Sequence, residues 1–199
     1  MSKSCDIIIV GGGHAGIEAA TASARMGAKV FLFTSDSNKI GEMSCNPAIG
    51  GIGKGHIVKE IDALGGEMSV SADKASIQYK VLNSSKGPAV RGPRCQADRV
   101  LYKNAINDAL KDYKDITVFS SMVSSLLIRR NKVEGVILDR EKKILSTAVV
   151  ITTGTFLNGI IHMGNSRVSA GRINEKASND LGKFLLSLKL PMARLKTGT

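Results

Sequence analysis

A glycine-rich loop near the N-terminus limits what this chain can fold into more than any other feature of its sequence. Four consecutive β-branched apolar residues, 7–10, are followed at once by Gly11-Gly12-Gly13-His14-Ala15-Gly16. Residues 17–26 are rich in small side chains and predict a helix, and the apolar run at 29–34 predicts a second strand. A strand, a GxGxxG loop, a helix and a second strand in this order form the βαβ unit that binds the diphosphate of a dinucleotide.

The three glycines of this motif have separate roles. Gly11 permits the tight turn out of the strand, Gly13 lets the diphosphate approach the backbone, and Gly16 lets the helix pack closely on the strand. An acidic residue normally ends the second strand and holds the ribose hydroxyls, but this strand ends at Thr34, and Asp36 follows two residues later. Either Thr34 or Asp36 takes this role, or the ribose is held elsewhere. The departure argues against NAD at this site.

The second half of the chain changes to the periodicity of strands. Short apolar runs separated by turn residues predict a β-meander over about 116–147, which leads into a buried strand at 148–152 and then Thr153-Gly154. In flavoproteins with two dinucleotide-binding domains, the crossover of the FAD domain is such a meander and leads into a strand that ends in Thr-Gly. The expected fold is therefore an α/β, Rossmann-type FAD-binding domain with a β-meander crossover, and it occupies residues 1–199.

Two further helices are expected between these regions. Residues 56–64 place Ile57, Ile61 and Leu64 on one face, and residues 98–113 repeat apolar side chains at helical spacing. The segment between the two helices includes a basic loop at 83–95 with two prolines.

The segment 44–55 holds the most unusual string, SCNPAIGGIGKG. It contains Gly-Lys but is not a phosphate-binding loop of the nucleotide hydrolases, because Ala48 and Gly55 stand where that motif needs glycine and a hydroxyl residue. Cys45 lies among glycines and near Lys54, where a thiol can acquire a lowered pKa. The alternative is that Cys45 is a small buried apolar residue. With only three cysteines, widely spaced, the chain has no pattern of a structural metal site, and a reducing compartment is expected.

The charge balance favours anionic partners. The chain carries 28 Lys and Arg against 17 Asp and Glu, a formal net charge of +11. Lys86, Arg91 and Arg94 in the basic loop can contact nucleic-acid phosphates or the cofactor, or can form an ordinary solvated loop. No apolar run approaches the roughly 20 residues that span a bilayer. We expect no membrane association, and we expect that a second part of the protein follows residue 199.

Several strings together resemble the MnmG (GidA) family from about residue 6 to residue 199. They are GGGHAGIEAA at 11–20, MSCNPAIGGIGKGHIVKEIDALGG at 43–66, KGPAVRGPR at 86–94, QADR at 96–99, TTGTFLNGIIHMG at 152–164 and RLKTGT at 194–199. The resemblance implies a cytoplasmic, homodimeric flavoenzyme that acts with the GTPase MnmE on tRNA. It would add a carboxymethylaminomethyl or aminomethyl group to C5 of the wobble uridine, with FAD as cofactor and NADH and methylene-tetrahydrofolate as co-substrates. It also implies that NADH-binding and C-terminal helical regions lie outside this chain.

The resemblance also implies roles for individual residues. The FAD phosphate loop falls on Gly11, Gly12, Gly13, His14, Ala15 and Gly16. Further FAD contacts fall on Val123 and Ser178. Cys45 is implied to be one of two functional cysteines, acting as a nucleophile or as an acid or base. Cys95 stands where the family pattern has alanine and is expected to be incidental.

Two other functions remain open at this point. One is a related FAD- and folate-dependent tRNA uridine C5-methyltransferase, which shares the GGGxAG opening. The other is a non-catalytic flavin-binding scaffold that recruits tRNA or a GTPase.

Overall fold

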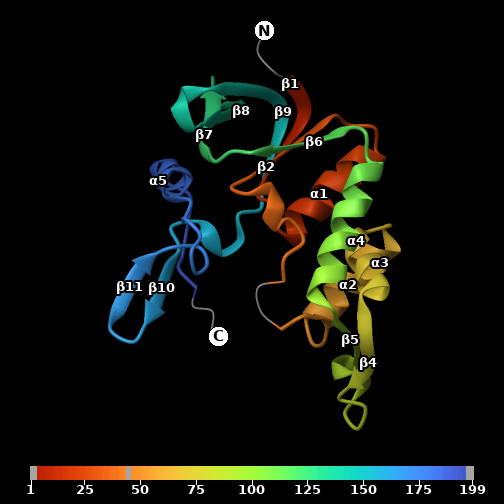
Figure 1. The fold of residues 1–199 in the computed structure, drawn as a ribbon. Helices are drawn as coiled ribbons and strands as arrows, with labels where there is room; N and C mark the ends of the chain where they lie inside the picture. The colour runs from red at the N-terminus through yellow and green to blue at the C-terminus, as the bar shows by residue number, and fades with distance from the viewer. Residues whose placement is uncertain (1–3, 44–45, 196–199) are drawn as a thin grey trace.

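A six-stranded sheet forms the centre of the computed structural model, which describes residues 4–43 and 46–195. Its strand order is β6-β2-β1-β9-β8-β7, with bounds β1 Ser4–Val10, β2 Val30–Thr34, β6 Ile116–Ser120, β7 Val123–Arg129, β8 Lys132–Leu138 and β9 Lys143–Ile151. The strands β6, β2, β1 and β9 are parallel, whereas β7, β8 and β9 pair antiparallel. The helices α1 His14–Arg25, α2 Lys54–Ala63, α3 Glu67–Lys74 and α4 Arg99–Asp112 gather on one side of the sheet (Figure 1).

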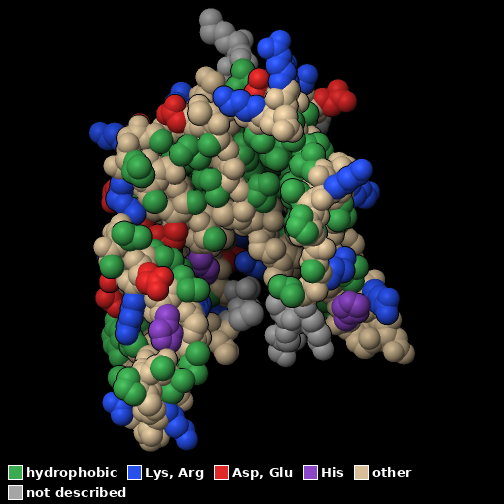
Figure 2. Space-filling model, turned by 180° about the vertical axis from the view of Figure 1, so that it is seen from behind, with side chains coloured by type: hydrophobic (Ala, Val, Ile, Leu, Met, Phe, Trp, Pro, Cys, Tyr) green, Lys and Arg blue, Asp and Glu red, His purple; other side chains and the backbone are tan. Residues whose placement is uncertain are grey.

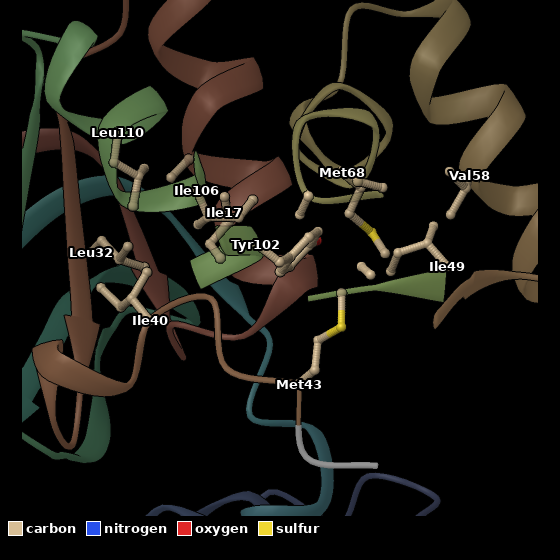
Figure 3. Packing of buried hydrophobic residues seen from close by; sticks show 14 of the residues in the cluster. Ile17, Leu32, Ile40, Met43, Ile49, Val58, Met68, Tyr102, Ile106 and Leu110 are labelled. Carbon is tan, nitrogen blue, oxygen red and sulfur yellow. The ribbon is translucent and has the colours of Figure 1, made fainter. Parts of the chain in front are cut away.

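The central strands β1 and β2 carry continuous apolar runs, at 7–10 and 30–33, because both faces of the sheet are covered there. Ile9, Val30 and Leu32 face α1 and α4 in one core, which also contains Tyr102 and Ile106 (Figure 3). The alternate residues of the same strands pack in a second core against the meander and the helix α5 Asn179–Ser187. They are Ile8, Val10, Phe31 and Phe33.

The meander comprises fewer strands than expected. Residues 116–120 pair parallel with β2 as β6, so the meander begins at Val123 and consists of β7, β8 and β9. The strand β9 belongs to both parts, because its first residues pair with β8 and residues 145–151 pair parallel with β1. The meander and the final buried strand, expected as separate elements, are therefore continuous.

Two arms extend from the body of the molecule (Figure 1). One is a three-stranded sheet of order β3-β5-β4, with β3 Ala48–Gly50, β4 Ser76–Leu82 and β5 Gly92–Ala97. The other is the hairpin of β10 Ile160–Met163 and β11 Ser166–Ser169. Part of the expected basic loop is thus strand β5, and the loop proper is shorter. The short helices η1 Ser37–Lys39, η2 Pro88–Val90, η3 Asp139–Glu141 and η4 Gly154–Phe156 lie in connections.

The apolar face predicted for the helix at 56–64 is largely exposed in the structure. In α2, Val58 and Gly55 are buried, whereas Ile57 is 57% and Leu64 81% exposed. The main contacts of the helix are with β3, β5 and α3. Its contact side is therefore narrow, and a small residue and a valine fill it.

Candidate dinucleotide-binding site

The glycine-rich loop connects β1 to α1 at the carboxyl end of the parallel strands. Gly11 has a φ of +115°, which favours glycine, and its amide donates to the Phe33 carbonyl at 2.8 Å. A Cβ on Gly16 would collide with the Gly11 carbonyl, and would lie 2.8 Å from Oγ1 of Thr152. The helix can therefore approach the strand this closely only because residue 16 has no side chain.

Thr152, directly after β9, fastens the loop from the other side. Its Oγ1 lies 3.0 Å from the Val10 carbonyl and 3.1 Å from the Gly11 carbonyl, and its amide donates to the Val10 carbonyl at 2.8 Å. The sequence predicted a Thr-Gly motif at 153–154, but not that the preceding threonine makes these contacts.

Gly13 differs from the other two glycines of the motif because no atom of residues 4–43 or 46–195 lies within 4 Å of the position of its Cβ. It precedes the first residue of α1, and Ala15 beside it is exposed. Amides in the first turn of a helix have no partner within the helix, and together with the helix dipole they favour an anion. The first turn of α1 holds no acidic residue that would oppose one. The loop thus fits the diphosphate of a dinucleotide.

Thr34 and Asp36, the two residues predicted to hold the ribose hydroxyls, lie at the end of β2 and just after it. The Asp36 carboxylate accepts a hydrogen bond from the Asn38 amide at 2.9 Å and so caps η1. Oγ1 of Thr34 lies 3.5 Å from the Asp36 carbonyl. Both residues stand at the carboxyl edge of the sheet, and the Asp36 oxygen that caps η1 is already engaged.

Val123 and Ser178 both lie on segments that reach this edge. Val123 is buried at the start of β7, two residues after Ser121, whose amide donates to the Thr34 carbonyl at 2.8 Å. Ser178 precedes α5, and its amide donates to the Phe156 carbonyl at 2.8 Å in the segment that follows β9. The structure therefore places Val123 beside the end of β2 and Ser178 beside the segment after β9. Their contacts with FAD remain predictions.

His14 is the first residue of α1, and its buried Nε2 has no hydrogen-bond partner among the residues that the structure describes. The same holds for the Tyr102 hydroxyl. The two rings lie 5.6 Å apart between centroids, at 46°. Burial lowers the pKa of His14 to about 4, and the positive charges of Lys54 and Arg172 act in the same direction. The imidazole is therefore neutral at pH 7. Burial also raises the pKa of Tyr102, which stays protonated.

The lowered pKa of His14 predicts a pH dependence of stability. An unfolded histidine titrates near pH 6.5, so between pH 6.5 and 4 the unfolded chain binds more protons than the folded one. His14 should therefore reduce the free energy of unfolding by about 3 kcal/mol as pH falls through this window, and have no effect above it. Urea unfolding of the wild type and His14→Gln at pH 7 and pH 4.5 measures this. Equal pH dependence in both proteins contradicts it.

The three cysteines lie in different parts of the chain, and two of them are among the described residues. Cys45, the predicted functional thiol, lies outside the described residues. Cys95 is buried in the core, with its Sγ 3.4 Å from the Ala72 carbonyl, which agrees with an incidental role. Burial raises the pKa of the Cys5 thiol to about 11, so it is not a thiolate at neutral pH. Cys5 lines a shallow hollow of about 280 Å³ at the amino ends of β1 and β9, away from the glycine-rich loop.

The glycine string after residue 48 and the basic loop lie on the first arm. Lys54 begins α2, and its Nζ donates to the Ala48 carbonyl at 3.1 Å. Lys86 and Arg91 are exposed, whereas Arg94 is half-buried in β5. Seen from behind, the molecule is hollowed between its two arms, and basic, acidic and histidine side chains meet there (Figure 2).

The family model for glucose inhibited division protein A, GIDA, matches residues 6–199. The chain belongs to this family. Two crystal forms of GidA from Aquifex aeolicus are similar to it at 44% sequence identity, with TM-scores of 0.89 and 0.90 over 95% of this chain. The family's predicted α/β fold with a Rossmann-type sheet and a meander crossover is confirmed. The chain spans 31% of the length of the Aquifex protein.

More distant structures share the fold alone. A GidA-related protein from Thermus thermophilus is 19% identical, with a TM-score of 0.60 over 92% of this chain and 68% of its own. Glycine oxidase from Bacillus cereus is 17% identical, with a TM-score of 0.52 over 76% of this chain and 56% of its own.

Among residues 4–43 and 46–195, none of the helices has the length and hydrophobicity that a membrane span requires. The same residues hold no group of three metal-ligating side chains.

Proposed function

We propose that this chain binds FAD through the loop Gly11–Gly16. The open space at Gly13 admits a diphosphate, and the first turn of α1 supplies amides to an anion. Gly11, Gly12, His14, Ala15 and Gly16 complete the loop, with Val123 and Ser178 on segments that reach the same edge of the sheet. The buried, unpartnered Nε2 of His14 supports a ligand or a water molecule at this position, because buried polar atoms rarely lack a hydrogen bond.

We further propose that the complete protein is a tRNA-modifying flavoenzyme that acts with the GTPase MnmE. It would install the carboxymethylaminomethyl or aminomethyl group at C5 of the wobble uridine, with NADH and methylene-tetrahydrofolate as co-substrates. The observation that carries this proposal is the family match over 6–199 in a chain whose phosphate loop is intact. A bound flavin supplies the electron transfer that such a modification needs. A homodimer in the cytoplasm is part of the same proposal.

In that reaction, the described residues would bind the cofactor and contact the tRNA. The glycine-rich loop binds and orients the diphosphate, and the two cores on either side of the sheet hold the loop rigid. Neutral His14 offers an uncharged nitrogen beside the loop. The exposed Lys86 and Arg91 at the tip of the first arm are the proposed contacts for tRNA phosphates.

The test uses the complete protein, purified and then examined by absorbance, with the released flavin identified by chromatography. Stoichiometric FAD is the expected result. A protein that stays colourless after addition of FAD contradicts the first proposal.

Nucleoside analysis of tRNA from a deletion strain then distinguishes the proposed wobble-uridine modification from the methyltransferase and scaffold alternatives. Loss of the carboxymethylaminomethyl or aminomethyl nucleoside is expected, whereas loss of 5-methyluridine would favour the methyltransferase and no change would favour the scaffold.

Replacement of Cys45 by serine tests the proposed role of this thiol. A hydroxyl is a much poorer nucleophile at neutral pH than a thiol, so tRNA modification should fall at least tenfold, on the order of a lost general acid, base or nucleophile. FAD content should stay unchanged. Cys95→Ala is the matched control, because this thiol is buried in the core and has no proposed role. Near-normal modification by the Cys45 variant would show that the thiol is not needed.

A further inference from the structure

The hairpin of β4 and β5, the outer part of the first arm, carries positive charges without any negative ones (Figure 1). Between Asp73 and Asp98 the sequence contains five lysines and arginines and no carboxylate, whereas the whole chain has 17 acidic residues for 28 basic ones. None of the five forms an ion pair with a residue in 4–43 or 46–195. They are Lys74, Lys80, Lys86, Arg91 and Arg94.

The strand register brings two of these cations together on one face of the hairpin. Lys80 lies directly opposite Arg94 in the antiparallel pair, and Gln78 lies directly opposite Gln96. Residues directly opposite each other share a face, and alternate residues of a strand do so too. All four side chains therefore lie on the same face. We call Gln78, Lys80, Arg94 and Gln96 the basic face of the arm.

The opposite face of the hairpin is apolar and packs toward the helices. Tyr79 lies opposite Cys95, whose Sγ is 3.4 Å from the Ala72 carbonyl of α3. Ile77 and Val81 share this face with Tyr79, and all three are more than half exposed because α3 covers only the part near β5. The arm is therefore two-sided, with its apolar residues and its charges on different faces.

The pairing of Lys80 with Arg94 is unfavourable for the fold itself. Like charges directly opposite each other on neighbouring strands destabilise a sheet, because their Cβ atoms are only about 4.5–5.5 Å apart. Lys80 is exposed and Arg94 is half-buried, and no carboxylate of the described residues is paired with either. An anion bound between the two side chains would remove this repulsion.

The composition of the basic face favours a nucleic-acid backbone over an acidic protein surface. Lysine, arginine and glutamine are side chains that contact phosphate and sugar oxygens. A protein interface is centred on apolar or aromatic anchors, and the basic face has none. The hairpin's one aromatic residue, Tyr79, lies on the other face, so the basic face has no ring on which a base can stack.

We propose that the basic face of the arm binds the sugar–phosphate backbone of RNA without regard to base sequence. The inference rests on the proposed tRNA-modifying function. It extends the proposed contacts at the tip, Lys86 and Arg91, along one defined face of the hairpin. The arm then supplies affinity for tRNA, whereas the choice among tRNAs is made by other parts of the protein, because phosphate contacts carry no sequence information.

The experiment measures the dissociation constants of tRNA and of an unrelated RNA hairpin for the complete protein over a series of salt concentrations. The double variant Lys80→Gln/Arg94→Gln should bind both RNAs about tenfold or more weakly, and the slope of log K against log salt should fall by about 1–2. Its melting temperature should not fall, because the substitutions remove two opposed like charges. Its FAD content should equal that of the wild type.

Lys132→Gln/Lys143→Gln is the matched control, because it removes two exposed cations from strands of the meander and changes the net charge equally. Its RNA affinity should remain within about twofold of the wild type. A wild type that binds neither RNA contradicts the proposed tRNA function. If the wild type binds tRNA and the Lys80/Arg94 variant binds it equally well with the same salt slope, the role of the basic face alone is overturned.

Two further outcomes also contradict the inference. Loss of affinity for tRNA with unchanged affinity for the unrelated hairpin would mean that the face reads a feature specific to tRNA. Loss of affinity for the partner GTPase with unchanged RNA binding would mean that the face binds an acidic protein surface.

Discussion

Alanine at position 16 should weaken cofactor binding by disturbing the fold, whereas alanine at position 13 should weaken it without disturbing the fold. In Gly16→Ala the new methyl group meets the Gly11 carbonyl and the Thr152 side chain. These neighbours are a backbone atom and a side chain that is itself hydrogen-bonded, so α1 must move away from β1. Overpacking of this kind costs about 1–3 kcal/mol or more, and we expect FAD affinity to fall on the order of 100-fold.

Gly13→Ala serves as the control because it adds the same methyl group to the same loop, at a position where no described residue would be hit. Gly13 has φ −78° and ψ −177°, which alanine adopts without strain, and its Cβ would meet no protein atom. The apoprotein should therefore unfold within about 2 °C of the wild type, while a methyl group in the diphosphate position weakens FAD binding at least tenfold. Thermal unfolding of the apoproteins and FAD titration measure both quantities. Unchanged FAD binding in Gly13→Ala would place the cofactor elsewhere.

Loss of the Tyr102 ring should be the most destabilising change in the core. Tyr102 is completely buried on α4, in the same core cluster as Ile17, Met68 and Ile106 (Figure 3), and its ring contacts that of His14. Tyr102→Ala leaves a large cavity, and truncation of a buried aromatic residue costs about 3–5 kcal/mol. We expect the melting temperature of the apoprotein to fall by roughly 10 °C.

Tyr102→Phe distinguishes the ring from its hydroxyl. The hydroxyl is buried and has no hydrogen-bond partner within the described part of the chain, so its removal should leave the free energy of unfolding unchanged or raise it by up to about 1 kcal/mol. Chemical denaturation of the apoprotein tests this. A loss of more than about 1 kcal/mol would mean that the hydroxyl is hydrogen-bonded, for which a water shared with His14 is the simplest candidate.

The sequence predicted the parts of the fold in which local pattern and tertiary environment agree. Buried parallel strands are continuously apolar, and Ile8 and Ile9 face opposite cores, so the run at 7–10 identified β1. The helix predicted over 98–113 is α4, which was predicted because its apolar side chains recur at helical spacing. The structure adds that Asp98 caps it through the amides of Val100 and Leu101. Gly11 and Gly16 predicted the loop because the geometry at each of these positions favours a residue without a side chain.

The first arm was not predicted from the sequence, because its local pattern and its environment in the fold do not agree. The strand β4 does alternate apolar and polar residues, with Ile77, Tyr79 and Val81 on one face, but that face is exposed, and β5 contains a glycine and a proline that suggest a loop. The ion pairs of Lys39 with Glu175 and of Arg172 with Glu42 had no sequence signal either. Glu42 and Arg172 lie far apart in the chain, and charged residues at such separations meet only through the topology of the sheet.

The order of strands also determines when the cofactor site can form during synthesis of the protein. Thr152 contacts the Gly11 carbonyl across 141 residues of chain, and β1 pairs with β9 over a similar separation. Closing a loop of that length has a large entropic cost that neighbouring contacts do not offset. A ribosome must therefore deliver the whole meander before the first turn of α1 and the loop before it can acquire their final shape. Until then the N-terminal βαβ segment lacks the strand that completes it, and this interval is when the nascent chain depends most on protection from aggregation.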